Sequence, residues 1–371
     1  MSAYCSMIHG GLALKFDENL PTNATAQNCC IIKNNVLDID IQTNFWNNLN
    51  FDTMRNLNKK DVWDPRCFGC KNIENNGGVS MRTGMNQGLI DSKKTNFSGP
   101  LRIDVTFDKS CNLACRICGS DSSTYWQKHL REHGLWNKPI FSDKNTDNLI
   151  TALSNIDLSN LKQFVFSGGE TLLGTEYWKV TEWLANNVPN SKEQLTVCFQ
   201  TNGTQPIPQK YFELIEKFYL VKLHISLDGI EEQFEYQRWP ASWNQVTDNL
   251  ADFKENLPSN VMFVVEETFS IFNLFYHNKV ANWICNNFAS NREGDVTNHT
   301  QHYAIGNFDI NNITIEYKNA ISKHLIKPGW QENPQAIKEM LIEIKKFDQF
   351  RNQSFVKTFP EVAEFYSRYL T

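Results

Sequence analysis

The sequence predicts an α/β fold whose main part is an open, TIM-like partial barrel of six β/α units. Strand-like runs alternate with helical stretches between residues 101 and 305, as is typical of a parallel sheet with crossover helices. Six units are too few to close an eight-unit barrel. Residues 1–98 are rich in Asn, Cys and Gly, so we expect an irregular N-terminal domain before the barrel at 99–310. A helical extension is expected at 311–371.

The first strand is predicted at Leu101 to Phe107, where apolar and polar residues alternate. Five further strand-like runs follow at 164–166, 195–199, 221–227, 261–266 and, weakly, 302–305. Helical stretches lie between them at about 121–133, 175–187, 209–218, 242–256 and 275–288. Two more helices are expected at 334–349 and 360–369. Residues 93–100 contain Lys-Lys and Ser-Gly-Pro and are expected to form a linker.

Composition excludes several classes of protein. The hydrophobic content of 41% supports a large core, and the net charge of −5 gives no polybasic signature for nucleic-acid binding. No apolar run reaches membrane-spanning length, and the N-terminus lacks a signal-peptide core. We therefore expect a soluble protein in a reducing cytoplasm, where ten cysteines favour clusters or metal over disulfides.

Three cysteines follow the first predicted strand. Cys111, Cys115 and Cys118 stand in a C-x₃-C-x₂-C run. Thiolates at this spacing on one loop can hold three irons of a [4Fe–4S] cluster and leave the fourth iron without a protein ligand. An iron with an open position can bind a substrate or cofactor, so the layout indicates chemistry rather than simple electron storage. Sites in folds of this kind gather at the carboxyl ends of strands.

The spacing resembles the signature of radical S-adenosylmethionine (SAM) enzymes. The resemblance implies that SAM chelates the open iron, and that reductive cleavage of SAM gives a 5′-deoxyadenosyl radical that abstracts hydrogen from substrate. Ile117 fills the apolar position before the last cysteine, and its backbone is expected to contact adenine. The resemblance covers about residues 1–280.

A glycine-rich segment follows the second predicted strand. In Ser167-Gly168-Gly169-Glu170 the glycines permit close approach of the backbone to a ligand, and the carboxylate can accept a hydrogen bond from an ammonium group. Gly-Gly-Glu alone is a common turn sequence. Its position after a strand resembles the family's motif for the SAM amino group.

Polar residues also end the third and fourth predicted strands. Asn202 precedes Gly203, and Ser226 and Asp228 precede Gly229, so ordinary turn chemistry is the alternative for these pairs. By resemblance, Ser226 and Asp228 face the ribose and methionine parts of SAM, with Asn202 nearby. Arg238 is expected to fork onto the SAM carboxylate, since guanidinium geometry suits that pairing. The alternative for Arg238 is a surface arginine stacked on Trp239.

The N-terminal cysteines form a second set. Cys67 and Cys70 make a C-x₂-C pair, and Cys5 and the doublet Cys29-Cys30 lie upstream. Residues 67–74, Gly77-Gly78, Ser80 and Arg82 resemble the pattern of radical SAM proteins with a twitch domain, a shortened SPASM domain that holds one auxiliary [4Fe–4S] cluster. The expected ligands are Cys5, Cys67, Cys70 and one member of the doublet, with Cys29 preferred. A four-cysteine zinc site is the alternative.

Two cysteines remain. Cys198 and Cys285 are both expected to pack in the core, and Cys285 is also a candidate hydrogen donor to a substrate radical. His9, His224 and His277 share no ligand spacing, and we interpret them as structural.

The favoured interpretation is a cytoplasmic radical SAM enzyme that tailors a ribosomally made peptide by cross-linking, epimerisation or a related reaction. A small-molecule or sugar substrate is the main alternative, and the acidic balance argues against a nucleic acid. A flavodoxin- or ferredoxin-type reductant is implied as partner, and no association with a membrane is expected. An iron–sulfur electron carrier and a zinc-based nucleic-acid module are the interpretations from other classes.

Overall fold

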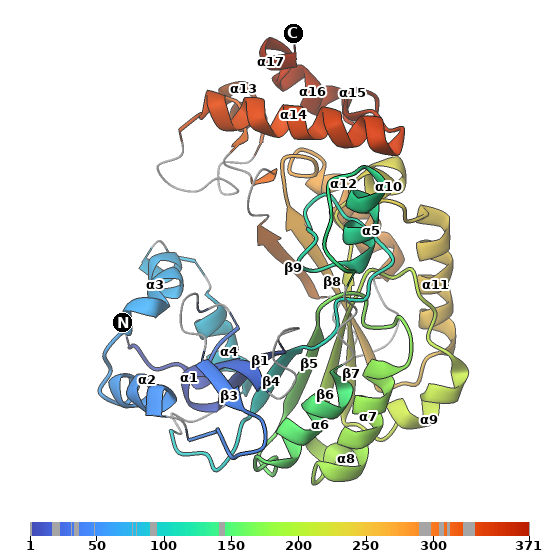
Figure 1. Ribbon diagram of the computed structural model, residues 1–371. Helices are drawn as coiled ribbons and strands as arrows, with labels where there is room; N and C mark the ends of the chain where they lie inside the picture. The colour runs from blue at the N-terminus through green and yellow to red at the C-terminus, as the bar shows by residue number, and fades with distance from the viewer. Residues whose placement is uncertain are drawn as a thin grey trace.

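The computed structural model describes residues 2–16, 23–30, 32, 37–47, 49–75, 77–78, 80–89, 95–140, 145–288, 298–303, 308–309, 312–321 and 331–370. One nine-stranded sheet organises this part of the chain, in the order β3-β2-β1-β4-β5-β6-β7-β8-β9. Helices such as α6, α7 and α11 cover one face of the sheet, and the C-terminal helices gather beyond its β9 end (Figure 1).

Six parallel strands form the centre of the sheet and confirm the six strands predicted from the sequence. Each of these strands pairs in parallel with the next along the chain. They are β4 (Arg102–Thr106), β5 (Gln163–Ser167), β6 (Thr196–Thr201), β7 (Leu220–Ser226), β8 (Val261–Phe269) and β9 (Asn298–Tyr303). Residues 304 and 305 of the last predicted strand lie outside the described residues. Because all six strands run in one direction, their carboxyl ends share one edge of the sheet.

The expectation of an irregular N-terminal domain was wrong for three segments. β1 (Gly11–Phe16) pairs in parallel with β4, and β2 (Asn23–Gln27) and β3 (Leu37–Asp40) extend the sheet in antiparallel fashion. The N-terminal region therefore continues the sheet of the barrel. The alternating Leu12, Leu14 and Phe16, all buried, were the signal for β1.

Most helices near the chain centre match the predicted helical stretches to within a few residues. The helices before the barrel are α1 (Ser6–Gly10), α2 (Leu49–Lys59), η1 (Pro65–Cys67), α3 (Phe68–Asn75) and α4 (Met81–Leu89). Those of the barrel are α5 (Thr124–Glu132), α6 (Thr146–Ser154), α7 (Glu176–Asn187), α8 (Ser191–Gln194), η2 (Gln209–Tyr211), α9 (Phe212–Ile215), α10 (Glu231–Gln237), α11 (Trp243–Asn256) and α12 (His277–Phe288). The sequence did not predict α6 or α10.

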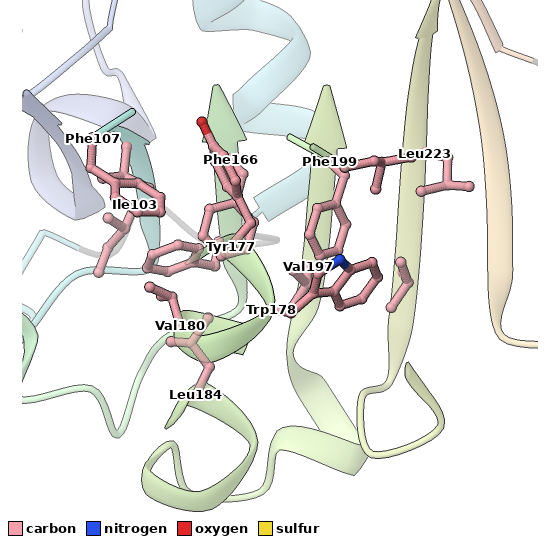
Figure 2. Packing of buried hydrophobic residues seen from close by; sticks show 14 of the residues in the cluster. Ile103, Phe107, Phe166, Tyr177, Trp178, Val180, Leu184, Val197, Phe199 and Leu223 are labelled. Carbon is pink, nitrogen blue, oxygen red and sulfur yellow. The ribbon is translucent and has the colours of Figure 1, made fainter. Parts of the chain in front are cut away.

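One face of the sheet packs against helices of the barrel such as α7, α11 and α12, and we call it the outer face. Alternate strand residues such as Ile103, Phe166 and Phe199 meet Tyr177 and Trp178 of α7 (Figure 2). Side chains alternate between the two faces of a strand, so the residues between these apolar ones point to the opposite, inner face. Because the apolar residues of each strand are buried on the outer face, the residues between them are the ones that lie on the inner face.

The C-terminal extension forms a second core. It contains α13 (Ile315–Ala320), α14 (Pro334–Arg351), α15 (Phe355–Thr358), α16 (Pro360–Phe365) and α17 (Ser367–Leu370). Their apolar residues pack on the segment that follows β8, around Phe269 and Phe272, with Ile117 at the edge. The two predicted C-terminal helices correspond to α14 and to α16 with α17. No helix among the described residues is long and apolar enough to cross a membrane.

Candidate functional site

The three cysteines of the C-x₃-C-x₂-C run lie together on the loop between β4 and α5. Cys111 and Cys115 are half-buried and Cys118 is exposed. Burial raises the pKa of all three thiols, that of Cys111 to about 12, and the neighbouring thiols raise the pKa of Cys111 and Cys115 further. Iron binding would therefore release protons from neutral thiols that are already gathered.

Contacts from two later segments hold this loop. Trp126 of α5 donates a hydrogen bond from Nε1 to the Cys115 carbonyl at 2.8 Å. The segment after α10 runs beside the loop, where Ala114 N donates to the Trp239 carbonyl and Arg116 N to the Gln237 carbonyl, at 2.8 and 2.7 Å. These backbone contacts place Arg238 next to the cysteine loop.

Gly168 and Gly169 lie directly against the start of the same loop. Gly169 N donates to the Asp108 carbonyl at 3.0 Å, and Glu170 N donates to the Ser110 carbonyl at 2.8 Å. A Cβ on Gly169 would lie 2.1 Å from the Ser110 oxygen, and a Cβ on Gly168, whose φ is +132°, would lie 2.3 Å from the Asp108 oxygen. The glycines therefore permit close approach of two loops, whereas the sequence argument invoked close approach to a ligand.

The Glu170 carboxylate joins the β5 loop to the end of β6. It accepts hydrogen bonds from Leu172 N, Thr201 Oγ1 and Asn202 N at 3.0, 2.6 and 2.6 Å. Burial raises the pKa of Glu170, while these donors oppose that rise. Asn202 in turn donates from Nδ2 to Asn112 Oδ1 at 3.1 Å, inside the cysteine loop. Hydrogen bonds thus join the Gly-Gly-Glu segment and the end of β6 into one unit.

Asp228 and Arg238 form a buried ion pair, with Arg238 Nη2 2.6 Å from Asp228 Oδ2. Asp228 Oδ1 also accepts a hydrogen bond from Thr268 N at 2.8 Å. Arg238 Nε has no hydrogen-bond partner among the described residues, whereas Asp228 Oδ2 is held by the guanidinium in the ion pair. Burial lowers the pKa of Arg238, but Asp228, Cys115 and Cys118 raise it overall. The arginine is buried rather than exposed as a surface stack on Trp239.

The remaining predicted SAM contacts lie at the same edge of the sheet. Ser167 ends β5 and shares a hydrogen bond of 2.8 Å with Thr106 Oγ1 at the end of β4. Ser226 ends β7, half-buried on the inner face, and Ile117 is half-buried at the edge of the C-terminal core. Three gathered thiols lie beside the guanidinium of Arg238, whose Nε has no hydrogen-bond partner among the described residues. This arrangement fits a cluster with a bound carboxylate ligand, since buried polar atoms are generally hydrogen-bonded.

Four N-terminal cysteines line one small cavity of about 60 Å³. The lining includes Cys5, Cys29, Cys67 and Cys70, while Cys30 lies outside it with an exposed side chain. Burial raises the pKa of Cys5 and of Cys67 to about 11. In the described part of the chain, no three His, Cys, Asp or Glu side chains have the geometry of a site for a single metal ion. The four thiols that the sequence grouped are neighbours in space.

A buried ion pair supports this cavity. The Arg82 side chain donates from Nε to Glu74 Oε1 at 2.9 Å and from Nη1 to the Tyr4 carbonyl at 2.6 Å. Ser80 Oγ donates to the same Glu74 oxygen at 2.5 Å. Because Tyr4 precedes Cys5, the pair ties the first cysteine to the segment that carries Cys70. This network uses the Glu, Ser and Arg positions of the twitch-like pattern.

A row of polar side chains crosses the inner face of the barrel, and sequence reasoning missed it. On β4, Arg102 pairs with Asp104 at 2.6 Å, and its Nη1 donates to Gln163 Oε1 on β5 at 2.8 Å. Gln163 Nε2 donates to Cys198 Sγ on β6 at 3.4 Å. Cys198 is buried, as predicted, but belongs to this polar row and not to the apolar outer face. These residues alternate along their strands with the apolar residues of the outer face, and this alternation was the sequence signal for the row.

The row continues through His224 on β7 to Glu266 on β8. His224 Nδ1 lies 2.6 Å from Glu266 Oε1, and Glu266 is the register partner of Ser226. Burial lowers the pKa of His224, but Cys198 and Glu266 outweigh this effect and raise it to about 9. The imidazole is therefore protonated at neutral pH and forms an ion pair with Glu266 close to the predicted SAM contacts.

Other predicted residues lie elsewhere. Cys285 is exposed on α12, whose Val280 and Ile284 pack into the outer-face core, so the expectation of a buried thiol was wrong. The position lends no support to a hydrogen-donor role. His9 lies 2.9 Å from Asn58 Oδ1, and His277 Nδ1 lies 2.8 Å from Glu267 Oε2, which agrees with structural roles.

Residues 106–272 match the family model of the radical SAM superfamily, and this match covers less than half of the chain. The matched segment begins at the end of β4 and contains the cysteine loop, the Gly-Gly-Glu segment and the Asp228–Arg238 pair. This segment is therefore similar to the radical SAM domains that the family model describes. None of the curated proteins matches the chain.

Similar solved structures include native anSMEcpe with bound AdoMet and the Cp18Cys peptide. It is 17% identical, with 68% of this chain and 61% of that chain covered and a TM-score of 0.39. Streptococcus suis SuiB bound to S-adenosylmethionine is 11% identical, with 95% and 74% covered and a TM-score of 0.35. The chain spans about three fifths of the length of anSMEcpe. Similarity at this level carries no argument about substrate.

The close approach of the two loops predicts a large effect of Gly169→Ala. The added methyl would push Ser110 and the cysteine loop away, which we expect to lower the free energy of unfolding by about 1–3 kcal/mol or more and to reduce iron incorporation. Gly119→Ala is the matched control, because no atom lies within 4 Å of a Cβ at that exposed position beside Cys118. Urea unfolding and iron analysis measure both variants, and equal behaviour of the two would contradict the close-approach argument.

The raised pKa of His224 predicts a loss of stability at alkaline pH. An imidazole with a folded pKa of about 9 contributes stability that is fully present below its unfolded pKa of about 6.5 and is lost as pH rises through 9. Glu266→Gln removes one cause of the raised pKa, so we expect a smaller loss of stability that is complete at a lower pH. Unfolding free energies measured from pH 6 to pH 10 test this, with His224→Asn as the variant that should lack the effect. Identical pH profiles in all three proteins would rule out the pairing.

Proposed function

We propose that this chain is a radical SAM enzyme, and the observation that carries the proposal is the three-cysteine loop beside the buried Asp228–Arg238 pair. The three cysteines would leave one iron open, and the pair offers a guanidinium whose Nε has no hydrogen-bond partner among the described residues. The family match of residues 106–272 supports the same function. When bound, the cluster and SAM supply reductive cleavage to a 5′-deoxyadenosyl radical that abstracts hydrogen from substrate.

The residues of the chain have distinct roles in this proposal. Cys111, Cys115 and Cys118 hold the cluster, and Arg238 binds the SAM carboxylate in the bidentate manner that a guanidinium permits. Asp228 orients Arg238. Glu170 positions the backbone of residues 200–202 and the loop that carries it, because its oxygens accept three hydrogen bonds from the protein. Ile117, Ser167, Asn202 and Ser226 line the remainder of the SAM site.

The N-terminal cavity is proposed to hold an auxiliary [4Fe–4S] cluster with Cys5, Cys29, Cys67 and Cys70 as ligands. The grouping of four thiols in one cavity supports this assignment, and the exclusion of Cys30 from the lining favours Cys29 as the member of the doublet. Four protein ligands would complete such a cluster, which would then relay electrons rather than bind substrate. A zinc ion at the same thiols is the competing assignment, and metal analysis separates the two.

The substrate is proposed to lie against the inner face of the barrel, beside Ser226 and the polar row. The ion pairs Arg102–Asp104 and His224–Glu266 would favour a polar substrate over an apolar one. A ribosomally made peptide is the first candidate, because proteins with a twitch-type pattern commonly modify peptides. A small molecule or sugar is the second candidate. A flavodoxin or ferredoxin is the proposed reductant.

The first test concerns SAM cleavage. In the triple variant Cys111→Ala, Cys115→Ala, Cys118→Ala, we expect 5′-deoxyadenosine formation to fall to background, because the open iron is lost. Anaerobic incubation with SAM and dithionite, followed by liquid chromatography, measures the product. The matched control is Cys285→Ala, an exposed thiol on α12, which should retain wild-type SAM cleavage. Cleavage that persists in the triple variant would show that the cluster is elsewhere.

The second test separates the two members of the cysteine doublet. Cys29→Ala should lower the iron content from about eight to about four atoms per chain, because an auxiliary cluster would lose a ligand. Cys30→Ala should keep the full content and serves as the matched control. Iron and acid-labile sulfide are measured in anaerobically reconstituted protein, together with zinc. If Cys30→Ala loses iron and Cys29→Ala does not, the doublet assignment is reversed, and zinc without iron in wild type would replace the auxiliary cluster.

A further inference from the structure

The C-terminal extension is anchored directly to the cysteine loop. Arg116, between the second and third cysteines, has a fully buried side chain and forms an ion pair with Asp348 of α14 at 2.6 Å. It also donates to Gln353 Oε1 at 3.0 Å, and its guanidinium carbon lies 3.7 Å from the centre of the Tyr236 ring. The carboxyl end of α14 thus lies against the residues that are proposed to hold the cluster.

Arg351, the last residue of α14, is buried next to this contact. Its guanidinium carbon lies 4.7, 4.9 and 5.1 Å from the ring centres of Trp126, Trp239 and Phe347. The side chain donates from Nε to His129 Nε2 at 3.4 Å, whereas Nη1 and Nη2 have no hydrogen-bond partner among the described residues. A buried guanidinium with two unsatisfied nitrogens is costly, so its position requires a physical reason.

The charges around Arg351 do not balance. Asp348 is the nearby carboxylate, but it already pairs with Arg116 and also accepts hydrogen bonds from Tyr236 Oη at 2.7 Å and Phe355 N at 2.6 Å. Burial and Arg351 lower the pKa of His129 to about 4, so this imidazole is neutral. Burial and Arg116 lower the pKa of Arg351 to about 9, which leaves its positive charge intact at pH 7.5. Asp348 is therefore shared by Arg116 and Arg351, Glu343 also acts electrostatically on Arg116, and Arg351 forms no ion pair of its own among the described residues.

The excess positive charge lies beside the second cysteine. Trp126, one ring of the cage, donates its indole N–H to the Cys115 carbonyl, and Trp239, another ring, accepts from Ala114 N through its carbonyl. Cys115 also interacts electrostatically with Arg351. A cluster held by three thiolates carries negative charge and gains more when it is reduced, and the net charge near a cluster sets its reduction potential. A fixed cation near a negatively charged cluster favours the reduced form.

We propose that Arg351 supplies the charge that balances the cluster at Cys111, Cys115 and Cys118, and that it thereby raises the reduction potential of this cluster. The inference rests on the proposed function and assigns a task to the C-terminal extension. In this proposal Arg351 acts on the cluster through Cys115 and its neighbours, so it is a positioning residue that changes the reduction potential. It contacts neither SAM nor substrate in this role.

Arg351→Met tests the proposal, because methionine fits an apolar and aromatic cage without charge. We expect the ratio of reduced to oxidised cluster at a fixed ambient potential to fall at least tenfold, which equals a shift of 59 mV for one electron. Redox titration followed by electron paramagnetic resonance measures this ratio, and the signal that changes upon SAM addition identifies the 111–118 cluster. Arg368→Met is the matched control, since that arginine is half-exposed on α17 of the same extension.

The melting temperature distinguishes an effect of Arg351 on the reduction potential from a purely structural role. Apo Arg351→Met should melt at the same temperature as wild type or higher, because an uncompensated buried charge is removed. A lower melting temperature with an unchanged potential would make Arg351 merely structural and overturn the proposal. Arg351→Gln is the second neutral variant, and loss of iron from both variants would place Arg351 in loop assembly, which also overturns it. A wild-type protein that forms no cluster would overturn the proposed function together with this inference.

Discussion

The structure depends on the contact between two loops at the carboxyl edge of the sheet. Residues 108–110, which lead into the cysteine loop, lie so close to Gly168 and Gly169 that no side chain fits between them. Glu170 then joins this unit to the end of β6, and Asn202 returns to Asn112. The cysteine loop is thus fixed by backbone contacts with the Gly-Gly-Glu segment as well as by side chains of its own, such as Asn112 and Arg116. Pre-organised thiols lower the entropy cost of binding a cluster.

A sequence argument predicts best where the signal is local. The six parallel strands and the helices at α7, α11 and α14 were predictable, because apolar periodicity and turn residues report on burial nearby. The cysteine loop was predictable because its spacing is itself the chemical signal. The short β2, with Asn, Ala, Thr and Gln, carries no such signal. It exists because β1 offers it a partner, and β1 in turn pairs with β4 about ninety residues away.

The site was predictable only in part, and for a physical reason. Sequence spacing groups residues on one loop, such as Cys67 and Cys70, but it cannot report which distant side chains compensate their charge. The Gly-Gly-Glu segment follows β5 as the sequence predicted, yet its glycines serve loop packing and its carboxylate accepts hydrogen bonds from protein donors. The polar row from Arg102 to Glu266 joins five strands, and each member alone resembles an ordinary strand residue. Only the sheet register brings these residues together.

An ion pair, in addition to apolar packing, joins the cysteine loop to the C-terminal extension. Arg116 is enclosed by Asp348, Gln353 and Tyr236, so the cysteine loop and α14 would each leave a buried charge unpaired without the other. Breaking such a pair is far more costly than replacing it with apolar residues. The C-terminal extension is therefore joined to the cysteine loop by a buried ion pair. Arg351, at the end of the same helix, forms no ion pair among the described residues, and in the proposal above its counter-charge would be the cluster held by the three cysteines.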